Sequence, residues 1–276
     1  MPLTIRSASV ALALALINVP ALGQTMLLDA LSRHGVQLPG GSFERAFDEG
    51  VAPSTPVAPG SFATSLALLA SGTGQERVDA AFAFGILAGR SGRAASGPEL
   101  NAAGTALVQM IGSSDRRSRI AGARVAGRIF AVPFDARVAT PLPAGLVDAL
   151  FTMWNRDHEI EQLAAMDALG LLRQLQAVSA LTERYQFYRD SNKRALAGGA
   201  IEALARIGDR STVDIVKVLA NDRWSEGRDA TALAVAFARE RMLKDGSVTI
   251  IRQALDDRAR RAQAIGYLTA LGVSVQ

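Results

Sequence analysis

The stretch that decides the fold of this 276-residue chain reads Ile201-Glu202-Ala203-Leu204-Ala205-Arg206-Ile207. Degenerate copies recur, each with a small or apolar residue, an Ala-Leu-Gly-like core and then, in most copies, Ile or Leu. The copies occupy residues 81–87, 123–129, 166–172, 230–236 and 262–268. Their matched Gly or Ala positions (85, 127, 170, 205, 234 and 266) lie about 29 to 43 residues apart, a spacing typical of helical repeats. The sequence therefore predicts an α-solenoid and not a single globular core.

The composition favours helices throughout. Hydrophobic residues make up 49% of the chain but aromatic residues only 5%, so the apolar side chains are mostly Ala, Leu, Val and Ile. Ala and Leu are strong helix formers. The absence of cysteine excludes disulfides, thiolate metal sites and cysteine nucleophiles. The net charge of +4 is mild and predicts no nucleic-acid partner.

The first 23 residues have the features of a cleaved export signal in the expected order. Arg6 precedes an apolar run over residues 10–17, and Pro20 and small residues up to Gly23 follow it. The run is shorter than the roughly 20 residues that cross a bilayer, and a buried N-terminal helix is the less favoured alternative. We expect a mature chain that begins near Gln24, has no transmembrane segment or lipid anchor, and is periplasmic or secreted.

Residues 24–60 are expected to connect the signal to the repeats. A short helix is predicted over residues 25–34, and Gly35 stands where helices often end. The stretch 35–60 then holds Pro39, Pro53, Pro56 and Pro59, which predict an extended linker or a cap that folds back on the array. The solenoid is predicted over residues 61–276.

Four helix pairs are predicted after Pro143, the last proline of the chain. They are residues 146–154 with 158–173, 177–188 with 192–207, 212–220 with 227–242, and 248–255 with 258–271. In the helix over 192–207, apolar residues cover two adjoining faces, as expected of an inner helix between its pair-mate and the next repeat. Val213, Val216 and Leu219 form the narrower stripe of an outer helix.

Small and acidic residues support this phase. Gly170, Ala205, Ala234 and Gly266 are expected to let inner helices approach closely. Asp157, Asp190, Asp222 and Asp256 stand before the second helices, about 32 to 34 residues apart, and Asp115 extends the series with a longer step. Aspartate at a helix start accepts backbone N–H bonds and complements the helix dipole, so these residues are predicted to be helix caps.

These residues together resemble HEAT repeats, in particular the bacterial HEAT-like class similar to the repeats of phycobilin lyases. The best matches are residues 190–219, with Ile207-Gly208-Asp209 between two helices, and residues 158–181; the resemblance covers about 75–272. The first helices after Pro143 lack the proline often found in HEAT units, and Ala234 replaces a more usual Gly. The resemblance implies a right-handed, curved array of antiparallel helix pairs that presents one face to a macromolecule.

The sequence nominates no catalytic, cofactor-binding or metal-binding residue. His158-Glu159 begins like the zinc motif H-E-x-x-H, but Gln162 stands where the second His belongs. His34 suits a helix C-terminus, and residues 71–74 suit a break between helices. Asp256-Asp257 and Glu159 with Glu161 are spaced so that the two carboxylates of each pair face different directions.

Two groups of side chains could contact a partner or a ligand. The aromatic residues Trp154, Tyr185, Phe187, Tyr188 and Trp224 are expected to cover the edge of the core, with ligand stacking as the alternative. As an alternative to solvated basic faces, a row along one edge could attract an acidic partner; its members are Arg189, Lys193, Arg194, Arg223 and Arg228. Arg258, Arg260 and Arg261 are expected to form a solvated face.

We therefore expect a non-enzymatic, exported HEAT-repeat scaffold or adaptor that binds a protein partner in the cell envelope without a cofactor. One alternative is a lyase-like subunit that holds a small molecule in a concave groove. Another is a closed module capped by the proline-rich segment. The sequence indicates neither the partner nor the residues that bind it.

Overall fold

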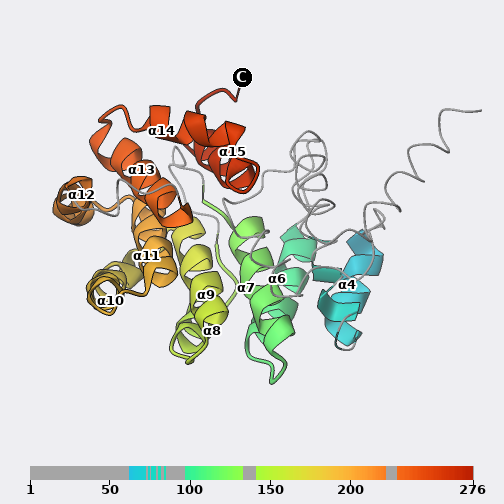
Figure 1. The fold of residues 1–276 in the computed structure, drawn as a ribbon. Coiled ribbons are helices and arrows are strands. Elements are labelled where there is room, and N and C mark those ends of the chain that lie inside the picture. The colour runs from blue at the N-terminus through green and yellow to red at the C-terminus, as the bar shows by residue number, and fades with distance from the viewer. Residues whose placement is uncertain are drawn as a thin grey trace, which may run out of the picture.

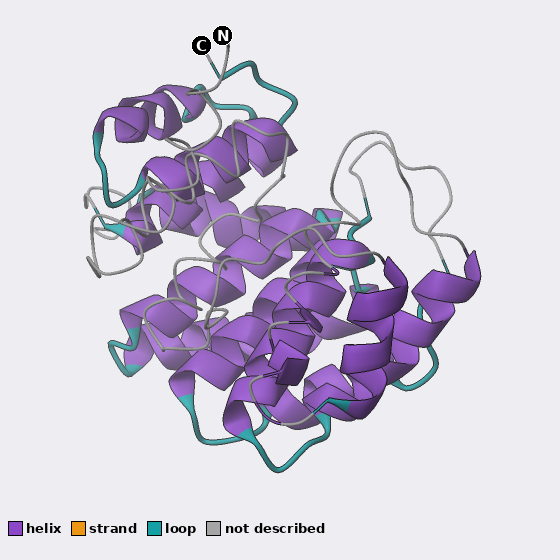
Figure 2. Cartoon of the chain, turned by 90° about the vertical axis from the view of Figure 1, so that its right-hand side faces the viewer, coloured by secondary structure: helices purple, strands orange, loops and turns teal. Residues whose placement is uncertain are grey.

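The described part of the chain is entirely helical. The structure is a computed structural model that describes residues 62–72, scattered positions between 74 and 84, and residues 97–132, 141–221 and 229–275. Every regular element in these ranges is a helix, and no strand occurs among them (Figure 2). The all-α prediction is confirmed for this part, whereas the export signal and the 24–60 segment lie outside the described residues.

The helices follow one another along the chain (Figure 1). They are α4 (Phe62–Ser71), α6 (Gly97–Ile111), α7 (Arg116–Ile129), α8 (Leu146–Trp154), α9 (Glu159–Leu171), α10 (Val178–Asp190), α11 (Arg194–Ile207), α12 (Val213–Ala220), α13 (Ala230–Leu243), α14 (Val248–Gln253) and α15 (Arg261–Ala270). Short 3-10 helices precede α10 (η2, Leu175–Ala177) and α12 (η3, Arg210–Thr212) and follow α14 (η5, Ala254–Asp256). The four predicted pairs are present, with ends that differ by about three residues at most.

The helices pack in pairs, and the second helices of the pairs pack on one another. α6 packs on α7, α8 on α9, α10 on α11 and α12 on α13. The second helices form an unbroken series in which α7 contacts α9, α9 contacts α11 and α11 contacts α13. We call α7, α9, α11 and α13 the inner row, and α6, α8, α10 and α12 the outer row (Figure 1).

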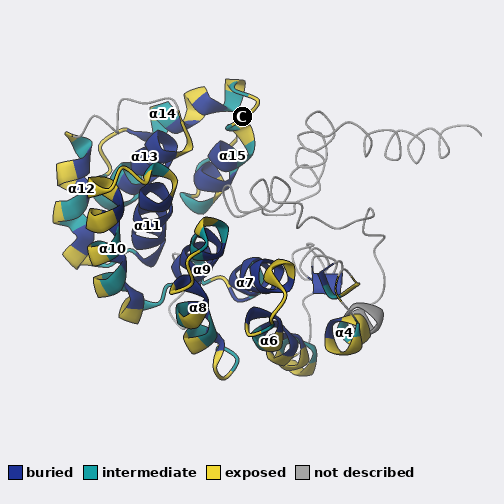
Figure 3. Ribbon diagram, turned by 60° about the horizontal axis from the view of Figure 1, so that its bottom comes forward, coloured by how far each residue is buried: buried dark blue, intermediate teal, exposed yellow. Residues whose placement is uncertain are grey.

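Burial separates the two rows (Figure 3). In α11 every residue from Leu196 to Ile207 is buried, because α9, α10 and α13 enclose it. In α12 only Val216 and Leu219 are buried. The wide apolar surface of the inner helix and the narrow stripe of the outer one are therefore confirmed, and the core lies between the rows.

Glycine allows the inner helices to approach closely. A Cβ atom on Gly170 of α9 would lie 2.8 Å from the Cα of Ala203 in α11, and one on Gly127 of α7 would lie 2.8 Å from the Cα of Ala168 in α9. Real Cβ atoms essentially never come this near another heavy atom. The predicted close approach at Gly170 is confirmed, and Gly127 repeats it one helix earlier.

The prediction of helix caps was right for one aspartate and wrong for three. Asp115 caps α7, since its Oδ2 accepts from the Ser118 backbone N–H at 2.8 Å. Asp190 is the last residue of α10, and neither Asp157 nor Asp256 caps the helix that follows it. The N-cap positions of α9, α11 and α15 belong instead to His158, Lys193 and Arg260, which make no side-chain capping bond.

The aspartates were misassigned because the real helices start later than the predicted ones. One residue separates Asp157 from α9, three separate Asp190 from α11, and four separate Asp256 from α15. The cap of α13 is Asp229, whose Oδ1 accepts from the Ala232 backbone N–H at 2.9 Å. Asp222 lies outside the described residues.

Candidate functional site

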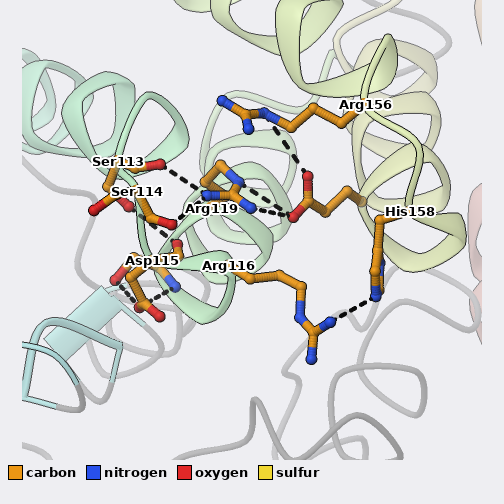
Figure 4. A network of polar contacts seen from close by, with 9 residues as sticks. Ser113, Ser114, Asp115, Arg116, Arg119, Arg156 and His158 are labelled. Atoms are coloured by element: carbon orange, nitrogen blue, oxygen red, sulfur yellow. Dashed lines mark hydrogen bonds and ion pairs between the residues drawn. The ribbon is translucent and has the colours of Figure 1, made fainter.

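A buried ion pair joins the first two inner helices. Arg119 lies in the first turn of α7, which Asp115 caps, and Glu161 lies in the first turn of α9 (Figure 4). Arg119 donates from Nε and Nη2 to Glu161 Oε1, with the Nε contact at 3.2 Å. Its Nη1 donates to the carbonyl oxygens of Ser113 and Ser114 at 2.9 and 2.7 Å. One guanidinium therefore ties the turn before α7 to the next inner helix.

Two further side chains border this pair (Figure 4). Arg156 Nε lies 3.9 Å from Glu161 Oε2. His158 Nε2 lies 2.9 Å from Nη1 of Arg116. A guanidinium can only donate, so Nε2 of His158 is the acceptor in this hydrogen bond. The half-buried His158 therefore links α9 to the start of α7.

A second buried polar group lies at the other end of the inner row. We call Glu202 and Arg206 of α11, Phe237 of α13, and Gln263 and Tyr267 of α15 the inner cluster. Arg206 donates from Nε and Nη2 to Glu202 Oε1 at 3.0 and 2.9 Å. The Tyr267 hydroxyl donates to Glu202 Oε2 at 2.6 Å, and Gln263 Nε2 donates to the Tyr267 oxygen at 2.8 Å.

Aromatic rings complete the inner cluster. The rings of Phe237 and Tyr267 stack with centroids 4.4 Å apart and an interplanar angle of 12°. The guanidinium carbon of Arg206 lies 5.3 Å from the Phe237 centroid and 5.8 Å from the Tyr267 centroid. A cation at this distance from a ring is attracted by the ring quadrupole. Arg206 thus combines an ion pair with two ring contacts.

Local electrostatics differ between the buried arginines. Burial disfavours the charge of Arg206, but the carboxylates of Glu202 and Asp167 outweigh it and raise the pKa of Arg206. At the end of α7, burial lowers the pKa of Arg128 to about 10. Burial, together with the nearby Arg173, lowers the pKa of Arg241. The carboxylates of α9 and α11 therefore favour positive charge in the middle of the inner row.

These groups hold helices in place relative to one another. The Arg119–Glu161 pair joins α7 to α9, and Tyr267 joins α15 to α11, while the Arg206–Glu202 and Gln263–Tyr267 contacts each lie within one helix. Buried polar side chains that are fully hydrogen-bonded rigidify and specify a packing arrangement. Among the described residues, no group of three or more His, Cys, Asp or Glu side chains could hold a metal ion. These buried polar groups therefore fix the positions of the helices, and with them the positions of the surfaces that the helices present.

The structure tests most of the predicted aromatic positions. Trp154, Tyr185 and Tyr188 are buried, as expected of residues that cover the core edge. Phe187 is 51% exposed, so the prediction was wrong for this residue, and Lys193 Nζ lies 5.6 Å from the centroid of its ring. Trp224 and His34 lie outside the described residues.

The structure describes part of the predicted basic row. Arg189 and Lys193 are exposed at the junction of α10 and α11. Arg194 is partly neutralised, because its Nη2 lies 2.8 Å from Asp229 Oδ2. Arg223 and Arg228 lie outside the described residues. The described part of the row therefore carries less positive charge than the sequence predicts.

The remaining predicted polar residues have surface or turn positions. Arg258 and Arg261 are exposed, and Arg260 pairs with Asp257 at 2.7 Å. Glu159 is exposed whereas Glu161 is buried, which confirms that these two carboxylates face different directions. A break follows α4 at Gly72, within the predicted 71–74, but Ser71 still belongs to α4 and Gly74 is again helical.

Sequence reasoning missed the buried charges of the inner row. Glu202 and Arg206 stand four residues apart in a run that is otherwise apolar from Leu196 to Ile207. Residues at this spacing lie on the same face of a helix, so a Glu–Arg pair within such a run signals a buried ion pair. Arg119 and Glu161 carry no such signal, because their partners are 42 residues apart in sequence.

Comparisons with known proteins leave the chain without an assigned family: no protein-family model matches it, and no curated protein matches it in sequence. Within the described ranges, no helix is both long and apolar enough to span a membrane.

Proposed function

We propose that the chain is a right-handed α-solenoid of HEAT-like antiparallel helix pairs and that it works as a non-enzymatic scaffold or adaptor. The observation that carries this proposal is the unbroken inner row, in which each second helix packs on the next across α7, α9, α11 and α13. Stacked pairs of this kind bury a continuous core and present extended surfaces that suit macromolecular partners. The resemblance of the Ile201–Ile207 motif to HEAT repeats supports the same reading.

The buried polar groups support a scaffold over an enzyme. Arg119 contacts Glu161 and backbone carbonyls, and Arg206 of the inner cluster contacts Glu202 and two aromatic rings. A nucleophile or general base must instead reach a reacting atom of the substrate. The partner in this proposal is a protein of the cell envelope, because residues 1–23 have the pattern of an export signal.

Affinity capture tests the scaffold role. The tagged mature chain, immobilised and incubated with native envelope extract, is expected to retain one protein in near-stoichiometric amount. Excess untagged chain should abolish that retention, which controls for non-specific adsorption. Failure to retain any protein would overturn the scaffold role, and turnover that a point substitution removes without unfolding the chain would overturn the non-enzymatic assignment.

Mass spectrometry of the protein from its native host tests the export step separately. A mature chain is expected to begin near Gln24. A chain that retains residues 1–23 would contradict export while leaving the scaffold role intact.

A further inference from the structure

The last helix pair, α14 with α15, departs from the packing of the pairs before it. The backbones of α13 and α15 approach each other at far fewer positions than those of α11 and α13. The row bends round from α7 to α13, and α15 lies over its concave side (Figures 1 and 3). Tyr267 of α15 thereby reaches Glu202 of α11, which lies two inner helices earlier. Side chains, more than close backbone contact, therefore hold α15 in place.

The surface that α15 covers is organised without it. Glu202 and Arg206 belong to one helix and pair with each other, so both remain paired if α15 leaves. Nε and Nη2 of Arg206 both donate to Glu202 Oε1, so Oε2 is the atom that accepts from the Tyr267 hydroxyl. Departure of a partner is costly mainly when it leaves a buried charge alone. This surface avoids that cost.

α15 presents a compact recognition face. Gln263 and Tyr267 stand one helical turn apart and bond to each other, while Ala264 and Leu268 of the same helix are fully buried. Gln263 Nε2 also lies 3.3 Å from the Ala230 carbonyl oxygen at the start of α13. The face combines one aromatic hydroxyl, one amide donor and small apolar side chains, which together fit an amphipathic helix.

The connection between α13 and α14 can act as a hinge. Lys244 and Gly246 both have positive φ values, 52° and 85°. Hinge motions are absorbed by a few loop or element-terminal residues, and these two residues lie between α13 and α14. A positive φ is unfavourable for Lys244 but not for Gly246.

We propose that α14–α15 is a displaceable terminal pair and that the surface around Glu202, Arg206 and Phe237 is a docking site for a partner helix. The partner is an amphipathic helix with an aromatic hydroxyl and an amide donor four residues apart, because α15 already fills the site with that arrangement. α15 therefore competes with the partner and is autoinhibitory. This inference rests on the proposed scaffold function and names its binding surface.

Peptide binding to the full chain tests the proposal. The probe is a fluorescent peptide with the sequence of residues 257–275, and the receptor is the full chain with Gln263→Ala and Tyr267→Ala, which weakens its own α15. Fluorescence anisotropy is expected to show that the peptide binds this variant at least about tenfold more tightly than the unaltered chain. The reason is that the chain's own α15 has lost its hydrogen bond to the charged Glu202 and competes less well. The same peptide with Tyr267→Ala should bind at least about tenfold more weakly.

Further variants keep the proposal open to refutation if the double variant is unstable. Tyr267→Phe keeps the ring stack and removes only the hydroxyl, so it should tighten peptide binding several-fold. Adding Glu202→Ala to either variant should abolish that gain, whereas Phe187→Ser on the exposed side of α10 should leave it unchanged. Equal affinity for the unaltered chain and for Tyr267→Phe, with intact helical circular dichroism, overturns the docking site.

Capture from envelope extract separates the two proposals. If the peptide does not bind but a native partner is still retained, the docking site is wrong and the scaffold function stands. If the peptide binds but no protein is retained, the site is supported and the scaffold function is contradicted.

Discussion

Arg119 and Glu161 are both buried between α7 and α9, where they form an ion pair. Removing one member of a buried pair leaves an uncompensated charge. We predict that Glu161→Ala lowers the free energy of unfolding by about 3 to 5 kcal/mol, measured by urea denaturation. Replacement of both residues, Arg119→Met with Glu161→Leu, should cost clearly less than the single change.

The exposed pair Asp214 and Lys217 provides the control for this prediction. Their charged atoms lie 3.1 Å apart, but their side chains are 88% and 62% exposed. Asp214→Ala should therefore change the free energy of unfolding by less than about 1 kcal/mol. If Glu161→Ala costs no more than Asp214→Ala, the buried pair does not stabilise the fold.

Which side chains of a helix face the core was easier to predict than which charged side chains pair inside it. The apolar period of α12 indicates which side chains face the core, because that information is local to one helix. The acceptor for Tyr267 is Glu202, 65 residues away, and no local pattern connects them. Polar groups that join distant helices therefore became visible only with the three-dimensional arrangement.

At the scale of the element, helix α7 depends on its aspartate cap. Burial opposes ionisation of Asp115, but hydrogen bonds from the side chain and backbone of Ser118 outweigh it and lower the pKa of Asp115. We predict that Asp115→Ala destabilises the chain by about 1 kcal/mol at neutral pH, as measured by urea denaturation.

The same cap gives a pH dependence of defined sign. The folded-state pKa of Asp115 lies below the unfolded value of about 3.9. Its charged contribution is therefore complete above the unfolded pKa and is lost as the pH falls through the folded pKa. The stability difference between the unaltered chain and Asp115→Ala should shrink below about pH 4. Asp115→Ser keeps a neutral cap, so its stability relative to Asp115→Ala should not shrink in this way.

Packing between inner helices depends on glycine at their crossing points. Gly170→Ala places a methyl group 2.8 Å from the Ala203 Cα, and backbone cannot move aside as a flexible side chain can. We predict that Gly170→Ala lowers the free energy of unfolding, measured by thermal denaturation, by about 1 to 3 kcal/mol, although Ala has the better helix propensity. Gly112→Ala, whose Cβ would lie 3.6 Å from the nearest atom, should be neutral within about 1 kcal/mol. Equal effects at the two positions would contradict close approach as the cause.

Helix ends show why the elements were only partly predictable. Breaks rich in Gly and polar residues located each pair within about three residues. The caps were misassigned because aspartate is favourable both in turns and at helix starts, so its presence does not fix the first helical residue. Asp190, for example, ends α10, and α11 begins only at Arg194.

At the scale of the whole molecule, the two rows should differ in how readily they open. In a serial array each helix is stabilised mainly by its immediate neighbours, so burial of a helix predicts its protection. α11 is enclosed by α9, α10 and α13, whereas α12 packs chiefly on α13 and η3. Among the described helices, the pair α14–α15 packs chiefly on α13, and it reaches α11 through the inner cluster.

Hydrogen exchange of the full chain measures this gradient directly. We predict the slowest amide exchange in residues 197–207, exchange at least about tenfold faster in α12, and similarly fast exchange in α14. Tyr267→Phe should accelerate exchange in α15 and leave α9 unchanged, because it removes only the hydroxyl, which contacts Glu202 of α11 and Gln263 of α15. Uniform protection across α11, α12 and α14 would instead indicate a molecule that opens as one cooperative unit, and would contradict both the serial array and the displaceable terminal pair.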